Sequence, residues 1–201
     1  MSIVVEHEKR RREILEKALD VFMDEGYEDV TFQKIADRCG ITRTTLYIYF
    51  KNKREIFNFS IKQLLQVLEN NITGVKKLKN LSHAEKLVRV MTLIIEHLEK
   101  NRRLLSVVLN YLIYASKSDS DSAYRVRRRT VRLRHIMTTM LVEGIKTGEF
   151  SKGINIKDAN ELLYSFLESA VFRLTVLRHP SADEIKAAIN LSVQGFTVLS
   201  T

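Results

Sequence analysis

Residues 31–56 read Thr31-Phe-Gln-Lys-Ile-Ala-Asp-Arg-Cys-Gly-Ile-Thr-Arg-Thr-Thr-Leu-Tyr-Ile-Tyr-Phe-Lys-Asn-Lys-Arg-Glu-Ile56. Two short segments with apolar residues at helical spacing are separated here by Gly40. Each segment follows a threonine whose hydroxyl can accept from the free amides of a helix start. Thr31 therefore predicts a helix over 32–39, and Thr42 predicts a second helix directly after the glycine.

The two predicted helices have about two turns each and are joined by a short turn that contains a glycine, which is the helix-turn-helix pattern. The second one, Thr42-Arg-Thr-Thr-Leu-Tyr-Ile-Tyr49, carries the polar and cationic side chains that a DNA major groove requires. A third helix is expected to begin at Asn52, where Glu55 completes a capping box. The segment predicts a DNA-binding protein.

The composition favours an all-α protein of one large or two small domains. The 201 residues include one proline and seven glycines, which leaves few β turns. Apolar residues at helical spacing and capping signals predict further helices. These cover about 6–25, 53–78, 82–100, 102–115, 121–147, 157–178 and 181–199, with a polar loop at 116–122. We therefore expect about nine helices, with a DNA-binding domain at 1–52 and a helical effector-binding and dimerisation domain at 53–201.

The net charge of +9 is unevenly distributed along the chain. Residues 1–54 have a net charge of +1 and residues 55–201 a net charge of +8. Residues 34–54 nevertheless contain six basic side chains and one acidic side chain. Because salt screens charge within about 8–10 Å, this local patch is better evidence for DNA binding than the total.

The single cysteine, Cys39, is expected to be a small buried residue in a reducing cytoplasm. The apolar run near the N-terminus is too short for a signal peptide core. No apolar stretch approaches the roughly 20 residues that cross a bilayer. We expect a cytoplasmic protein without a membrane partner.

A spaced pattern in the first 56 residues resembles the TetR (tetracycline-repressor) family of transcriptional regulators. Its members here are Ala18, Phe22, Gly26-Tyr27, Thr31, Ile35-Ala36, Gly40, Leu46-Tyr47, Tyr49-Phe50, Lys53 and Ile56. The resemblance covers about a quarter of the chain. It implies a helical homodimer, with an N-terminal domain that binds double-stranded DNA and a C-terminal domain that binds a small-molecule effector.

By position, the resemblance implies that Arg43 and Thr44 contact base edges. It implies that Thr42, Tyr47 and Tyr49 hold the phosphate backbone, together with Lys53 at the start of the fourth helix. Thr44 departs from the family, because many members have glycine or another very small residue there. The complete set expected at the DNA is Thr31, Thr42, Arg43, Thr44, Tyr47, Tyr49 and Lys53.

The segment Arg125–Arg134 contains six arginines and no acidic residue. Arg127 and Arg134 flank an apolar stripe that includes Met137 and Met140, so they could bind an acidic effector. The alternative is that they pair with glutamates of adjacent helices. Beside the apolar helix at 102–115, this stripe suits a mostly apolar cavity. The residues expected at a hydrophobic or amphipathic effector are Tyr111, Tyr114, Arg127, Arg134, Met137 and Met140; a well-packed core has the same composition.

The last two predicted helices carry more apolar surface than one buried stripe requires, which predicts a four-helix dimer interface. Its expected residues are Leu163, Phe166, Leu167, Ala170, Leu174, Ala188, Ser192 and Gly195. The alternative is that both helices belong to the core of a monomer.

No pattern in the chain favours catalysis. We find no Gly-rich phosphate loop and no paired-histidine metal spacing, and the five histidines are scattered, so we expect no cofactor, no metal and no enzyme activity. The sequence predicts a ligand-responsive repressor that leaves a near-palindromic operator when its effector binds. The alternative is a helical anion-binding protein or an enzyme that uses the arginine-rich helix.

Overall fold

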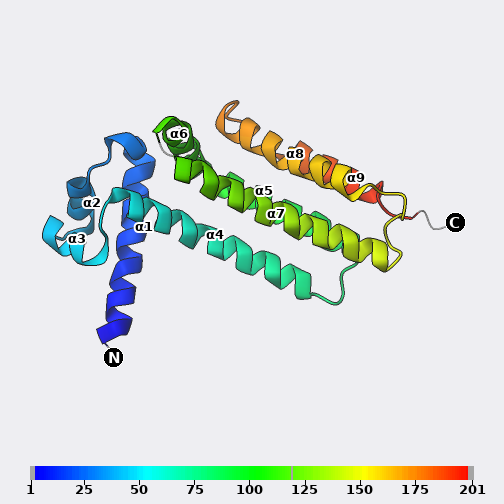
Figure 1. The fold of residues 1–201 in the computed structure, drawn as a ribbon, viewed down its shortest axis with the longest axis horizontal. Coiled ribbons are helices and arrows are strands. Elements are labelled where there is room, and N and C mark those ends of the chain that lie inside the picture. The colour runs from blue at the N-terminus through cyan, green and yellow to red at the C-terminus, as the bar shows by residue number, and fades with distance from the viewer. Residues whose placement is uncertain (1–2, 119, 199–201) are drawn as a thin grey trace. The chain divides into compact units, whose positions relative to one another are not determined.

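The computed structural model describes residues 3–118 and 120–198, and their side chains except those of 3, 4, 64 and 114–130. These residues form nine α-helices (Figure 1). The helices are α1 (Ile3–Asp29), α2 (Phe32–Cys39), α3 (Arg43–Tyr49), α4 (Lys53–Lys77), α5 (His83–Lys100), α6 (Arg102–Ser118), α7 (Ser120–Lys146), α8 (Ile156–Thr175) and α9 (Asp183–Gln194). The predicted all-α fold is confirmed. None of the helices, within the part of the chain described, is long and apolar enough to cross a membrane.

The chain divides into two compact units. The N-terminal unit contains residues 1–67 and 106–114, and the C-terminal unit contains residues 68–105 and 115–201. The domain boundary expected between residues 52 and 53 falls at the turn between α3 and α4. It stays a prediction about which part of the chain folds independently.

The predicted caps set the geometry of the helix-turn-helix. Thr31 Oγ1 accepts a hydrogen bond from the Lys34 amide at 3.2 Å, and Thr42 Oγ1 accepts one from the Thr45 amide at 3.1 Å. Between them, Gly40 has a φ of 67° and a ψ of 36°, a left-handed conformation that costs glycine little. Two capped starts around one glycine thus fix where α3 leaves α2.

The start of α4 differs in one detail from the predicted capping box. Asn52 Oδ1 accepts from the Glu55 amide at 2.9 Å, as expected. The Glu55 carboxylate, however, accepts from the amide of Lys51 at 2.6 Å. The reciprocal bond therefore closes one residue earlier than the pattern predicts.

The core of the N-terminal unit lies where α1 packs against α2, with α3 and the start of α4 beside them. Its fully buried side chains include Ile14, Phe22, Ile35, Leu46, Phe50, Ile56 and Phe57. Cys39 is buried as predicted, and its Sγ lies 4.0 Å from the Ile14 carbonyl oxygen. Burial raises the pKa of the Cys39 thiol, although nearby cations oppose the shift, so the side chain stays a neutral core residue.

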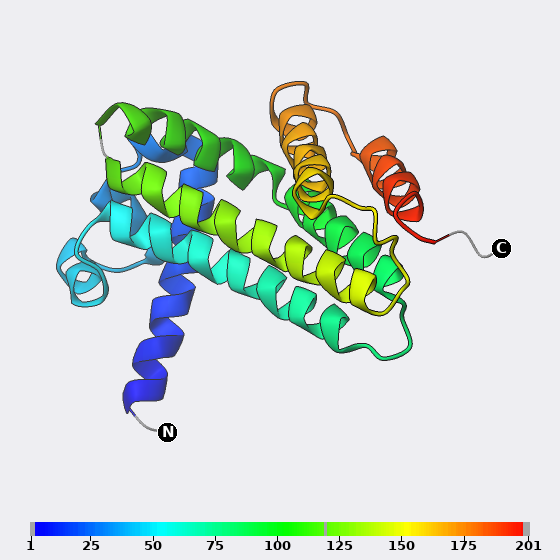
Figure 2. The same ribbon diagram turned by 45° about the vertical axis from the view of Figure 1, so that its right-hand side comes forward.

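In the C-terminal unit, α5 packs against α7, α8 and α9, and α8 also packs against α7 and α9 (Figure 2). Two sets of hydrogen bonds cap the start of α5. Ser82 and Glu85 form the predicted capping box, and the Glu149 carboxylate accepts from the amides of His83 and Ala84 at 2.7 and 2.8 Å. Partial burial raises the pKa of Glu149, but the bonds from Ala84 and His83 outweigh it and lower the pKa.

The end of α7 packs closely against Phe150. A Cβ atom added at Gly144 would lie 2.2 Å from the Phe150 ring, which is fully buried. Glycine therefore lets the ring lie directly on the helix backbone.

The polar loop predicted at 116–122 is wrong in extent, because α6 continues to Ser118 and α7 begins at Ser120. Serine and aspartate are unfavourable in the middle of a helix but are accepted near its ends.

Candidate nucleic-acid interface

Helix α3, the second helix of the helix-turn-helix and the predicted recognition helix, buries one side chain and exposes most of the others. Leu46 is fully buried, whereas Arg43, Thr44, Tyr47 and Ile48 are exposed. Arg43 and Tyr47 are four residues apart, as are Thr44 and Ile48, so these pairs form two adjacent rows on the helix surface. The expected base-contacting residues, Arg43 and Thr44, thus lie together with Tyr47 on the outer face.

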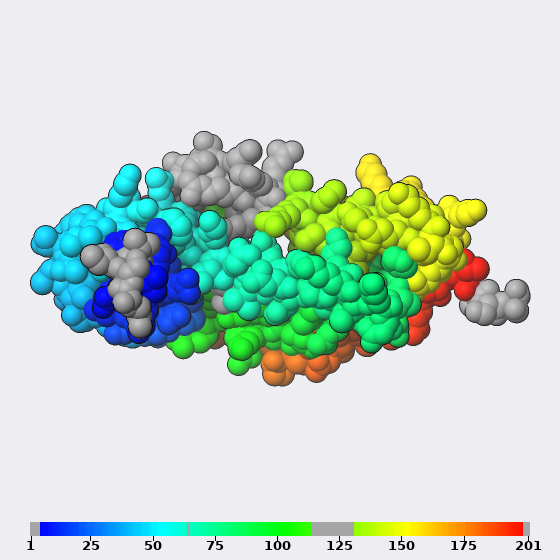
Figure 3. All heavy atoms as spheres, turned by 90° about the horizontal axis from the view of Figure 1, so that it is seen from below, coloured from blue at the N-terminus to red at the C-terminus, as the bar shows by residue number. Residues whose placement is uncertain are grey.

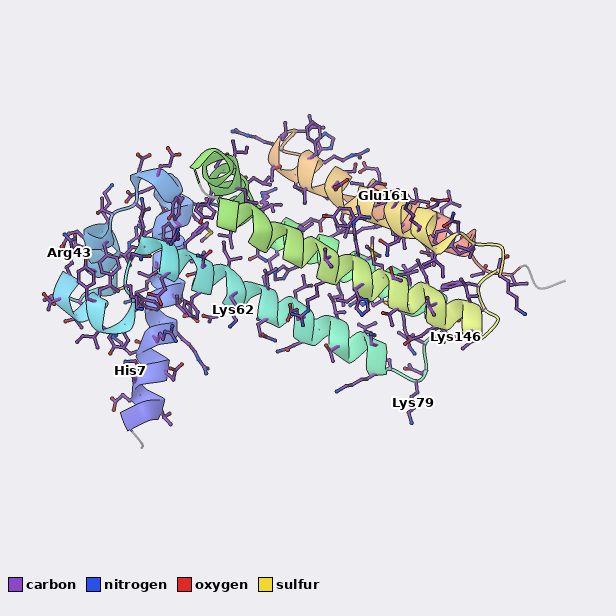
Figure 4. The ribbon with its side chains drawn as sticks, viewed as in Figure 1. His7, Arg43, Lys62, Lys79, Lys146 and Glu161 are labelled. Atoms are coloured by element: carbon purple, nitrogen blue, oxygen red, sulfur yellow. The ribbon has the colours of Figure 1, made fainter. Side chains whose placement is uncertain are left out.

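Arg43 and Tyr47 hold each other in place. One terminal nitrogen of Arg43 donates to the Tyr47 hydroxyl at 3.2 Å, and the guanidinium carbon lies 5.7 Å from the centre of the Tyr47 ring. The Phe32 ring on α2 contacts the same tyrosine, with ring centres 4.6 Å apart. No carboxylate of the described residues pairs with Arg43, which points outward from α3 (Figure 4). Its remaining donors match the O6 and N7 acceptors of guanine.

Ile48 is a surface residue that the sequence analysis missed. Its side chain is 68% exposed although it is apolar, and it lies one turn beyond Thr44. The signal was available, because Leu46 and Phe50 mark the core side of α3 and leave Ile48 on the other side. An exposed apolar side chain on a recognition helix suits the methyl group of thymine.

The hydroxyls of Thr31 and Thr42 serve as helix caps, and both residues are exposed. Thr42 Oγ1 also lies 2.8 Å from Thr45 Oγ1. Tyr49 is half-buried, and its ring stacks on that of His7 in α1. Thr31 and Thr42 thus lie at the starts of α2 and α3, and Tyr49 lies at the end of α3.

The structure gives Lys53 a role other than the phosphate contact that the resemblance implies. Its Nζ donates to the carbonyl oxygens of Tyr27, Glu28 and Val30 at 2.9, 2.8 and 2.8 Å. An ammonium group has three donors, so none remains for a phosphate. Partial burial lowers the pKa of Lys53, while the Asp29 and Glu28 carboxylates oppose the shift. The lysine closes the carboxyl end of α1, where Gly26 has already interrupted the helix with a φ of 81°.

Two other basic residues of the 34–54 patch are paired within the N-terminal unit. Lys34 Nζ lies 2.5 Å from a Glu25 carboxylate oxygen, and Arg38 lies 3.3 Å from Asp24. Their charges are therefore largely compensated. Among the six basic residues counted from the sequence, Arg43 and Lys51 remain exposed without a carboxylate partner in the described part of the chain.

The described residues expected at the effector divide between the two units. Tyr111 is buried in the N-terminal unit, with its ring centre 4.4 Å from that of Tyr27 and 4.9 Å from that of Phe57. Met137 and Met140 are buried in the core of the C-terminal unit. The side chains of Tyr114 and Arg127 lie outside the described residues.

Arg134 pairs with a glutamate of an adjacent helix, which was the alternative to binding an acidic effector. Its two terminal nitrogens donate to the Glu161 carboxylate at 2.5 and 3.2 Å, and its guanidinium carbon lies 3.9 Å from the Tyr164 ring centre. The hydrogen bond and charge of Glu161 raise the pKa of Arg134. Arg134 is thus paired with an adjacent helix and is not an unpaired cation in a pocket.

Two buried polar atoms of the C-terminal unit have no hydrogen-bond partner in the part that the structure describes. They are Nε2 of His97 and Oδ1 of Asn160. Burial lowers the pKa of His97, and the charge of Lys100 adds to this. The other amide atom of Asn160 donates to the Arg134 carbonyl and to Thr138 Oγ1 at 2.7 and 2.6 Å. Asn160 was not predictable from the sequence, because helix periodicity does not separate a buried polar residue from an exposed one.

The expected dimer residues divide into two groups. Leu163, Leu167, Ala170 and Leu174 are buried within the chain itself. Phe166, Ala188 and Ser192 are half-buried and Gly195 is exposed. The outward apolar side chains of α8, α9 and the turn after α8 are instead Leu162, Phe172, Val176, Leu177 and Leu191.

No group of three or more histidine, cysteine, aspartate or glutamate side chains among the described residues could hold a metal ion.

Residues 14–58, which span the helix-turn-helix, match the model of the bacterial regulatory proteins of the tetR family. Over most of its length the chain is also 26% identical to the fatty acid metabolism regulator protein of Bacillus subtilis (strain 168), across 167 residues that cover 79% of this chain and 80% of that one. The chain belongs to the TetR family. It is a DNA-binding transcriptional regulator and not an enzyme.

Solved transcriptional regulators share the fold over nearly the whole chain. A TetR transcription regulator from Haloarcula marismortui superposes with a TM-score of 0.82, at 18% identity, over 95% of this chain and all of that one. The regulator FadR from Bacillus subtilis, solved in complex with stearoyl-CoA, superposes with a TM-score of 0.70, at 22% identity, over 94% and 99% of the two chains. The transcriptional repressor KstR2 of Mycolicibacterium smegmatis is 26% identical across 163 residues, 81% of this chain and 76% of that one.

Proposed function

We propose that the protein is a homodimeric repressor that leaves a near-palindromic operator when a fatty-acyl effector binds its C-terminal unit. The observation that carries the DNA-binding part is the outer face of α3. There Arg43 is exposed, has no carboxylate partner among the described residues, and is oriented by Tyr47. In a two-fold dimer, two such helices about 34–36 Å apart would reach successive major grooves.

Release requires an effector that prefers a conformation with another spacing of the two recognition helices. The effector can lower DNA affinity only by as much as its own affinity differs between the two conformations. The same coupling makes DNA weaken effector binding by an equal factor.

The proposal of a fatty-acyl effector is supported by the similarity to the fatty acid metabolism regulator protein of Bacillus subtilis. It agrees with the hydrophobic or amphipathic molecule predicted from the sequence. The unpaired atoms of His97 and Asn160 supply buried polar positions inside a largely apolar unit, which a ligand with a polar head could satisfy. The surface depression of about 410 Å³ between α1 and α2 is a poor candidate, because it is lined by Glu25, Lys34, Asp37 and Arg38 with Val21.

DNase footprinting of the DNA upstream of the protein's own coding region tests the DNA-binding part, with stearoyl-CoA as the effector probe. We expect a protected near-palindrome that loses protection as stearoyl-CoA is added, while free coenzyme A has no effect. Protection that persists at saturating stearoyl-CoA would contradict the fatty-acyl proposal and leave the DNA-binding proposal intact.

The dimer is proposed to form through the outward faces of α8 and α9. Leu191, 72% exposed, and Phe172, 52% exposed, would be covered by the second copy. Leu191→Lys should shift the protein from dimer to monomer in light scattering at micromolar concentration. Asn190→Lys, at the neighbouring exposed position, is the matched control, and a wild-type monomer would contradict the proposal.

An anion-binding protein that uses the arginine-rich helix is the weaker candidate. Its described arginines are already paired, Arg134 with Glu161 and Arg132 with Glu69 at 2.8 Å.

A further inference from the structure

The first two turns of α1 extend beyond the apolar core of the N-terminal unit. At 100° per residue, His7 and Arg11 continue the line of the buried Ile14 and Ala18 toward the start of the helix. The buried face of α1 therefore ends in two polar side chains. Figure 3 shows these first turns (dark blue) at the surface, beside the cyan atoms of the segment around residue 50.

Both polar side chains stack on aromatic rings, His7 on one at the end of α3 and Arg11 on one just beyond it and another in α4. The His7 and Tyr49 rings have centres 4.6 Å apart and planes inclined by 25°. The guanidinium carbon of Arg11 lies 5.1 Å from the Phe50 ring centre and 4.3 Å from that of Phe59. Stacking of this kind holds a cation in place while its edge stays available for hydrogen bonds.

Arg11 differs from its neighbour Arg10 in having no acidic partner. Arg10 lies 2.9 Å from Glu13, an ion pair within the same helix. Nε of Arg11 is buried without a partner, and no described residue accepts from its terminal amino groups, which reach solvent. Glu6 and Glu8 lie about a quarter turn to either side of His7, so neither faces the stack.

We propose that Arg11 binds a DNA backbone phosphate beyond the C-terminal end of α3, and that His7 positions Tyr49 for its contact with the same backbone. Arg11 supplies paired N–H donors of the kind that match phosphate oxygens. The positions of both groups are set by rings next to the helix that inserts into the groove. This inference rests on the DNA-binding part of the proposed function and adds a second element, α1, to its interface.

The test of Arg11 is a salt titration of binding to the footprinted operator, with full-length protein. Arg11→Met keeps an unbranched apolar stem between Phe50 and Phe59 and removes the charge. We expect the slope of log K against log salt to become shallower by about one unit, and the affinity to fall about tenfold near 0.1 M salt. Arg12→Met, the exposed neighbour that does not stack, is the control and should leave the slope within half a unit. Thermal melting of each variant checks that it folds.

The test of His7 compares two substitutions at a single pH. His7→Ala removes the ring against Tyr49 and should weaken operator binding several-fold without changing the salt slope. His7→Phe restores a stacking ring and should restore the affinity. A salt slope that changes in His7→Ala would mean that His7 itself binds phosphate, and failure of His7→Phe to restore binding would overturn the positioning role.

If Arg11→Met and His7→Ala both bind like the wild type while Arg43→Ala loses specific binding, α1 is not part of the DNA interface and the proposed function stands. If Arg43→Ala also binds like the wild type, the recognition helix itself has been misassigned.

Discussion

The predicted recognition helix α3 and the arginine-rich helix α7 differ in what their described arginines contact. Residues 125–134 of α7 contain six arginines, whereas α3 contains one. Arg134 of α7 pairs with Glu161 and stacks on Tyr164, while Arg43 of α3 contacts Tyr47 and no carboxylate of the described residues. An arginine that must give up a carboxylate partner gains less from an external anion than an arginine without one. The number of cations is therefore a poorer guide to a nucleic-acid surface than the number left without an acidic partner.

The largest expected effect is on DNA binding. Arg43→Ala should cost about 1–3 kcal/mol of specific binding and relax preference at one base pair, because one bidentate base contact is lost. Arg134→Ala should leave operator affinity unchanged in the same salt titration. Equal losses of operator affinity in the two variants would show that paired and unpaired arginines do not differ in DNA binding.

Lys53→Met extends the comparison to a paired cation within the DNA-binding unit. Removing the ammonium leaves the carbonyls of Tyr27, Glu28 and Val30 without their donor, so the free energy of unfolding should fall by about 2 kcal/mol. The salt slope of DNA binding should stay the same, and urea denaturation together with a salt titration measures both quantities. Lys51→Met, two residues earlier and exposed, should show the opposite pattern. A shallower slope with full stability for Lys53→Met would restore the phosphate contact that the family pattern implies.

Lys186 is a paired cation of the C-terminal unit. Its Nζ lies 2.7 Å from Glu99 and 3.1 Å from Asp183. Burial lowers the pKa of Lys186, but the bonds to Glu99 and Asp183 outweigh burial and raise it above 10.5. Its stabilising contribution is then complete below the unfolded-state pKa and is lost as pH rises through the folded-state value. Lys186→Met should lower stability by about 1 kcal/mol at pH 7, and the difference from the wild type should shrink above pH 10.5. Lys152→Met, in an exposed loop, controls for the loss of a surface charge, and a difference independent of pH would exclude the ion pair as its cause.

The smallest effect is expected where an exposed ion pair is broken. Glu161→Gln leaves the fork of Arg134 without its carboxylate, yet both groups lie near water, so Tm should fall by no more than about 2 °C. Differential scanning calorimetry measures this change. A decrease larger than that of Lys186→Met would show that exposure is the wrong criterion for ranking these pairs.

Local features of the chain were predictable from the sequence. The caps at Thr31, Thr42 and Ser82 lie within three residues of the amides they hold, so spacing alone identified them. The buried state of Cys39 was expected for a small apolar residue in a predicted helix, whereas the place of Arg43 at the start of α3 came from the family resemblance.

Contacts between distant segments were not predictable. Lys53 contacts carbonyls more than twenty residues earlier, and Arg134 contacts Glu161, 27 residues later. Tyr111 is assigned to the N-terminal unit although most of the chain around it belongs to the other. Periodicity gives the face of a helix on which such a residue lies, but not the segment that covers that face.

The contact between Phe150 and Gly144 means that the side chains at these two positions limit each other's size. The ring occupies the volume that a side chain at 144 would need, so alanine at 144 would require a smaller residue at 150. Among related sequences these two positions should therefore covary, with bulk at one accompanied by its loss at the other. Anyone redesigning this end of α7 would have to exchange both residues together.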